Sequence, residues 1–146
     1  MPISTTRTAA PTSFWIVAVL SLLWNAMGAF DYSATKLRLD FYMSQFSPAQ
    51  LDYFYNFPAW ATVGWALGVW GALAGSIGLL LRKAWASLAF AVSLLGLATS
   101  SLYNIVLSGG MEIMGAGAMA FTAIIWIVAI LLFWYARRQG HRGVLA

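Results

Sequence analysis

The feature that constrains this chain most is an apolar run from Phe57 to Leu81 that contains no charged residue. Arg82 and Lys83 follow it directly. A helix rises about 1.5 Å per residue, so a helix over this run is long enough to cross the roughly 30 Å hydrocarbon core of a bilayer. The sequence therefore predicts a transmembrane helix here.

Small residues recur along this run at alternating steps of three and four. On a helix this spacing places them on one face, where another backbone can approach closely. They are Ala61, Gly64, Gly68, Gly71, Gly75 and Gly78. A channel wall is one interpretation of such a groove, but we favour close helix packing or dimerisation, its more usual role in membranes.

Composition extends the membrane interpretation to the whole chain. Of 146 residues, 62% are hydrophobic and 8% are charged, whereas soluble domains carry about 25% charged residues. The apolar runs predict spans at about 14–32, 58–81, 85–107 and 112–135. We therefore expect an all-α integral membrane four-helix bundle, residues 14–136, with antiparallel up-down topology.

The first span is the one that resembles a signal peptide. However, it contains Trp15, Trp24 and Asn25, and no convincing cleavage site follows before the Asp31–Tyr32 boundary. We therefore favour a retained transmembrane helix over a cleaved leader.

The segments outside the spans are more polar. Residues 1–13 are rich in Thr, Ser and Pro and predict a disordered cytoplasmic arm, and residues 137–146 predict a basic cytoplasmic tail. Residues 33–57 form the one long connection, in which Ser47-Pro48-Ala49-Gln50 has the pattern of a helix start. We expect a short amphipathic helix after it, and leave residues 36–46 open between helix and extended chain.

The turn at Arg82-Lys83 is short, so spans two and three are expected to be antiparallel neighbours. The third span repeats the small-residue spacing at Ser93, Gly96 and Ser100. The simplest packing puts this face against the glycine face of the second span.

Charge placement predicts the orientation. With four spans, the side that holds both termini and the 82–83 turn carries six Arg or Lys residues and no acid, and the other side carries all four acids. The positive-inside rule then places both termini in the cytoplasm. The loop of residues 33–57 becomes periplasmic in a bacterial inner membrane.

Seven residues near the outer ends of the spans are candidates for ligand binding. They are Asn25, Asp31, Tyr32, Trp65, Tyr103, Asn104 and Glu112. Together they would line an outward vestibule in which rings stack on a polyol and polar groups bind its hydroxyls. The alternative, which we favour residue by residue, is structural: Asn25 makes an interhelical hydrogen bond, and Asp31 and Glu112 are solvated at helix ends.

Enzyme chemistry has little support in the sequence. The chain has no cysteine, and its single histidine lies in the basic tail. No metal-ligand cluster or nucleophile motif is present in the sequence. We therefore expect no catalytic residues, no metal, no cofactor and no enzymatic activity.

Several stretches of residues 14–107 resemble a family of small bacterial inner-membrane proteins with four spans. The matching pieces are Leu22-Leu23-Trp24-Asn25 with Gly28 and Tyr32, Phe57-Pro58-Ala59-Trp60, Trp65 to Gly71, and Leu79 to Lys83 with Trp85-Ala86. Members are often labelled automatically as sugar transporters. The resemblance implies a bacterial inner-membrane location and supports transport, but no site residue is carried over from it.

Two functions remain open at this point. The first is a non-enzymatic protein that binds or transports a small polar solute such as a sugar, and four short spans would then need a homo-oligomer to enclose a path. The second is a scaffold that packs on a larger membrane partner through its glycine face. Both imply contact with the lipid bilayer and neither involves nucleic acid.

Overall fold

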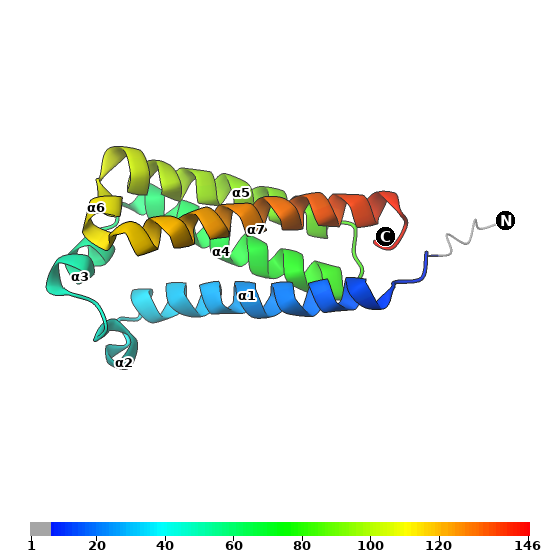
Figure 1. Ribbon diagram of the computed structural model, residues 1–146, viewed down its shortest axis with the longest axis horizontal. Coiled ribbons are helices and arrows are strands. Elements are labelled where there is room, and N and C mark those ends of the chain that lie inside the picture. The colour runs from blue at the N-terminus through cyan, green and yellow to red at the C-terminus, as the bar shows by residue number, and fades with distance from the viewer. Residues whose placement is uncertain (1–6) are drawn as a thin grey trace.

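The computed structural model describes residues 7–146 of the chain, and the regular structure in these residues is entirely helical. Four helices are long and apolar enough to cross a membrane, which confirms the predicted all-α fold with four helices of spanning length. They are α1 (Thr12–Lys36), α4 (Ala59–Leu80), α5 (Ala86–Ser101) with its continuation η1 (Leu102–Leu107), and α7 (Ala116–His141). Figure 1 shows these helices side by side, each running opposite to the one before it.

Three short helices lie together at one end of the bundle, opposite the start of α1 and the C-terminus (Figure 1). They are α2 (Asp40–Met43), α3 (Pro48–Tyr55) and α6 (Gly110–Met114). The predicted helix start at Ser47 is confirmed: its hydroxyl accepts a bond from Gln50 N, and the Gln50 side chain accepts one from Ser47 N. Residues 36–46, for which the sequence did not distinguish helix from extended chain, contain α2, a single helical turn.

Two helix boundaries differ from the expected spans. Helix α1 runs on to Lys36, past the charged Asp31. The last long helix starts at Ala116 instead of near 112, because Gly115 has a φ of 91°, a conformation that glycine adopts readily and other residues do not. This bend separates α6 from α7.

The small-residue faces of α4 and α5 lie against each other. A Cβ placed on Gly71 would lie 3.0 Å from Ser93 N, and one on Gly78 would lie 2.9 Å from the Ala86 Cβ. A Cβ on Gly96 would collide with the backbone of Gly64 and Gly68. The two backbones therefore meet in direct contact, and the glycine face of α4 is covered inside the subunit.

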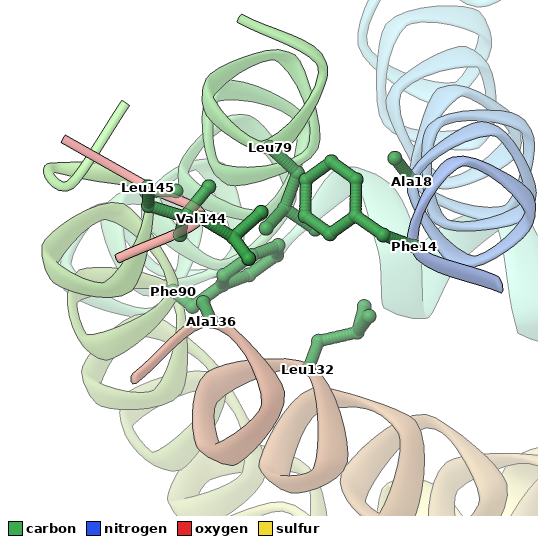
Figure 2. Close-up of a cluster of buried hydrophobic side chains, with 9 residues drawn as sticks. Phe14, Ala18, Leu79, Phe90, Leu132, Ala136, Val144 and Leu145 are labelled. Carbon is green, nitrogen blue, oxygen red and sulfur yellow. The ribbon is translucent and has the colours of Figure 1, made fainter. Parts of the chain in front are cut away.

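A cluster of buried apolar side chains closes the end of the bundle that holds both termini. Figure 2 shows Phe14 of α1, Leu79 of α4, Phe90 of α5 and Leu132 of α7 converging there. Phe14 and Leu79 are fully buried. The cluster joins all four long helices at this end.

The predicted basic tail is part of this end. Helix α7 continues to His141, and the residues after it turn back so that Val144 and Leu145 enter the apolar cluster. Arg82 Nε donates to Val144 O (3.0 Å), and Ala146 N donates to Arg82 O (3.0 Å). Of the expected disordered arm, residues 1–6 lie outside the described residues, whereas Thr8 donates to Gly143 O through its backbone N (3.1 Å).

Candidate functional site

A cavity of about 570 Å³ lies within the bundle. All four long helices contribute to its wall, and α3 and the segment before it cover one end. Its volume is within the 300–1,000 Å³ range of pockets that hold small organic ligands. At the opposite end the lining includes Phe90 and Leu132, which belong to the apolar cluster of Figure 2.

The cavity exists because small residues on α1 and α4 leave room between wide side chains. A Cβ on Gly28 would meet nothing within 4 Å, and Gly28, Gly68 and Ala72 all belong to the lining. The facing surface of α7 is mostly aliphatic, with Ile125 and Val128 turned inward. The space is therefore largely apolar, with a few polar groups at defined places.

Asn25 is the polar group nearest the middle of the bundle. It is 8% exposed, and its Nδ2 donates to Ser76 Oγ (2.7 Å) and Ala72 O (3.2 Å) on α4. A carbonyl only accepts, so this pair of bonds fixes the nitrogen of the amide toward α4. Asn25 thus makes the interhelical hydrogen bond that its place in the sequence suggests.

The other end of the same amide faces the cavity. No donor to Asn25 Oδ1 is found in residues 7–146. Every fully enclosed side-chain polar atom of the described residues has a hydrogen-bond partner, so an oxygen without one must border open space. The open space beside Asn25 is the cavity, which offers Oδ1 as an acceptor to a bound molecule.

Asp31 lies in the cavity wall six residues beyond Asn25 on α1. The hydroxyl of Tyr42 donates to its Oδ1. Burial, followed by this hydrogen bond and the charge of Asp31, raises the pKa of Tyr42 above the ordinary range of a phenol. Tyr42 therefore keeps its proton and remains the donor to the carboxylate.

Asn104 reaches the cavity from η1, a stretch of π-helix at the end of α5. Such stretches are rare and recur at functional sites. The Tyr53 hydroxyl donates to Asn104 Oδ1 and lies 2.8 Å from Ser108 Oγ. Burial is the largest influence on Tyr53 and raises its pKa, so this phenol also stays protonated.

Aromatic rings form a continuous chain around this end of the cavity. Tyr32 meets Trp65 edge to face at 4.8 Å between ring centroids, Trp65 meets Phe57 at 5.9 Å, and Phe57 meets Tyr103 at 4.7 Å. Tyr53 stacks on Tyr103 at 6.0 Å. The chain links α1, α3, α4 and η1 into one rim.

The structure places the seven candidate residues in three positions. Asn25, Asp31, Trp65 and Asn104 line the cavity. Tyr32 and Tyr103 contact the lining rings Trp65 and Phe57 from behind. Glu112 lies apart, exposed in the first turn of α6.

Five aromatic lining residues from the long connection were not among the candidates. They are Tyr42, Phe46, Tyr53, Phe54 and Phe57. Their spacing in the sequence does not indicate which residues they contact. Tyr42 donates to Asp31, and Tyr53 to Asn104, only because the connection folds over the bundle. Their aromatic character at the mouth of a bundle was the only signal available.

The described residues contain no group of three or more His, Cys, Asp or Glu side chains that would hold a metal ion. Comparison of the chain with protein-family models, curated proteins and solved structures found no match.

Proposed function

We propose that this protein is a non-enzymatic, multi-pass membrane protein that binds a small organic solute in the cavity between its four long helices and takes part in its transport. The sequence resemblance favours a sugar as the solute. The observation that carries the proposal is the cavity itself, with the oxygen of Asn25 and the carboxylate of Asp31 at its wall. A bundle evolved only for packing would gain stability by filling such a space.

We further propose a bacterial inner membrane as the location, with both termini in the cytoplasm. The end of the bundle with α2, α3 and α6 carries the acids Asp40, Asp52 and Glu112, and the end with the termini carries Arg82, Lys83 and the arginines of α7. Under the positive-inside rule the mouth beneath α3 would then face the periplasm. The closed apolar cluster would face the cytoplasm.

Binding of a sugar to purified protein tests this function directly. Trp24 and Trp65 line the cavity, so their fluorescence is a suitable signal when maltose or glucose is titrated into protein in nanodiscs. We expect Asn25→Ala and Asn104→Ala to weaken binding at least about tenfold, which corresponds to about 1.4 kcal/mol. Asn56→Ala is the matched control, because Asn56 is exposed and bonds only to Asp52 in its own helix.

Equal binding by all three variants would place the solute elsewhere and contradict the proposal. Circular dichroism of each variant checks that the helices remain intact.

The alternative function, a scaffold on a larger membrane partner, is favoured by one feature of α7. Only 6% of its most apolar stretch is buried within the chain, against 28% for each of the other three long helices. The glycine face of α4 is covered by α5, so a partner or a second copy would have to use another face, and α7 is the long helix least buried within the chain. Crosslinking in native membranes through photoreactive residues on the outer face of α7 would identify such a partner. Crosslinks to lipid alone would count against a scaffold.

A further inference from the structure

The Asp31 carboxylate lies at the cavity without a compensating cation. The hydrogen bond from Tyr42 reaches Oδ1, and within residues 7–146 no Lys, Arg or His nitrogen comes close enough for an ion pair. Lys36, the next charged residue on α1, turns instead to Thr62 Oγ1 (3.3 Å) and to the ring of Trp65. A partly buried carboxylate is costly unless it is paired, so this site is suited to a positive charge from outside the chain.

The cavity wall contains no positive charge of its own. No lysine, arginine or histidine is among the described residues that line it. Lys36 and Arg38 lie at the same end of the molecule, but their cationic groups sit over Trp65 and over Tyr55, and neither side chain belongs to the lining. An anion would therefore meet one carboxylate and no counter-charge.

Hydroxyl groups in the wall are already used as hydrogen-bond donors. Ser93 Oγ donates to Gly68 O (2.6 Å), and Ser100 and Thr122 each donate to a carbonyl of their own helix (3.2 and 2.9 Å). Each hydroxyl has one proton, so its oxygen offers only lone pairs to the cavity. Together with Asn25 Oδ1 and Asp31, these atoms accept hydrogen bonds from a ligand.

Aromatic rings surround the carboxylate end of the cavity. Phe46, Phe54 and Phe57 line it together with Tyr42, which touches Phe46 edge to face at 5.8 Å. The faces of such rings attract cations within about 6 Å of the ring centre. The rest of the wall, toward Leu132, is mostly apolar and would cover a hydrocarbon body.

We propose that the solute of this cavity is an organic monocation, with an ammonium group held between Asp31, Asn25 and the aromatic rings and an apolar body directed toward α7. This inference rests on the proposed solute-binding function and names its substrate class, an organic cation in place of the sugar that the sequence resemblance favours. A neutral sugar would leave the charge of Asp31 unused and would bury its hydroxyls against aliphatic side chains. A protonated amine supplies the missing charge and the N–H donors together.

Three probes of one shape separate the alternatives by charge. They are 2-(2-naphthyl)ethylammonium, 2-(2-naphthyl)ethanol and 2-naphthylacetate, measured by equilibrium dialysis against the protein in nanodiscs of zwitterionic phosphatidylcholine, with empty nanodiscs subtracted. Maltose serves as a fourth probe. We expect the ammonium probe to bind at least about tenfold more tightly than the alcohol, and the carboxylate probe to bind most weakly.

Substitution of the carboxylate then tests its role. Asp31→Asn should reduce the affinity for the ammonium probe to that for the alcohol, while Asp31→Glu should keep the preference. Asp40→Asn is the matched control, because Asp40 lies at the same end of the molecule but is exposed and outside the lining. If Asp31→Asn does not fold, the comparison of ammonium with alcohol on the unmodified protein decides.

Equal binding of alcohol and ammonium, or an unchanged preference in Asp31→Asn, would overturn the inference. If maltose or the alcohol binds instead and Asn25→Ala abolishes that binding, the proposed function stands and only its substrate class is wrong. If none of the four probes binds, both are contradicted.

Discussion

Asn25 illustrates how one side chain serves the fold and the cavity at once. Its nitrogen ties α1 to α4 through Ser76 and Ala72, and its oxygen remains free at the cavity wall. Hydrogen bonds between membrane helices contribute about 0.6–2 kcal/mol. Structural and ligand roles, which compete when only the sequence is considered, are therefore compatible at this residue.

Replacing Asn25 by leucine, which keeps the bulk and removes both polar ends, should lower the free energy of unfolding by about 1–2 kcal/mol, because Ser76 Oγ loses its donor and Ala72 O keeps only the bond from Ser76 Oγ. Thermal unfolding in detergent measures the change. Asn56→Leu, at the exposed C-terminal end of α3, should shift stability by less than about 0.5 kcal/mol. Equal effects at the two positions would show that the Asn25 bond contributes nothing specific.

The paired Tyr42 and Asp31 predict a distinct pH dependence. Since the folded state raises the pKa of Tyr42, it binds the phenolic proton more tightly than the unfolded state does. Its contribution to stability is then complete below about pH 10, the ordinary tyrosine value, and is lost as pH rises through the higher folded value. The phenolate absorbance of Tyr42→Phe should therefore match that of the parent at about pH 10 and fall below it only at higher pH; a difference already present at pH 10 would contradict the pair.

At the scale of elements, the α4–α5 contact is the tightest in the molecule. Four glycines on α4 face backbone atoms of α5 within 3.0 to 3.3 Å of an added Cβ: Gly64, Gly68, Gly71 and Gly78. The spacing of the small residues predicts this contact from sequence. The short basic turn between the two helices makes them antiparallel neighbours, so their small-residue faces can pack together. The same argument fails for α7, because a Cβ added to its glycines, Gly117 and Gly140, would meet nothing within 4 Å.

A matched pair of glycine substitutions tests the contact. Gly96→Ala places a methyl group against the backbone of Gly64 and Gly68, so the helices must separate, and we expect a loss of about 1–3 kcal/mol. Gly117→Ala on α7 meets nothing within 4 Å and should leave stability unchanged or raise it by up to about 1 kcal/mol. Chemical denaturation of both variants in the same detergent compares them, and a tolerated Gly96→Ala would argue against the packing.

The sequence predicts elements in this chain better than it predicts the site. Apolar runs and glycine spacing are local signals, so the four long helices and the Ser47 cap are readable in advance. The partnership of Tyr53 with Asn104, 51 residues apart in sequence, depends on how the long connection returns over the bundle. No periodicity encodes such a contact.

At the scale of the whole molecule, the proposed orientation is open to a direct test, because the chain has no native cysteine. Ser44 and Lys83 are both exposed and lie at opposite ends of the bundle. A membrane-impermeant maleimide added to intact cells should label Ser44→Cys, and should label Lys83→Cys only after the membrane is opened. The reverse pattern would invert the orientation and put the mouth of the cavity in the cytoplasm.

Helix α7 packs chiefly on α5 and touches α1 through two ring pairs, Phe121 with Trp24 and Tyr135 with Phe14. The α7 side of the cavity is therefore supported mainly by whatever surrounds the protein. Bilayer thickness and lateral pressure would then act on the width of the cavity as directly as a mutation does. If the cavity binds a solute as proposed, affinity measured in thin and in thick lipid would differ for the same polypeptide, and the lipid would be part of what defines the site.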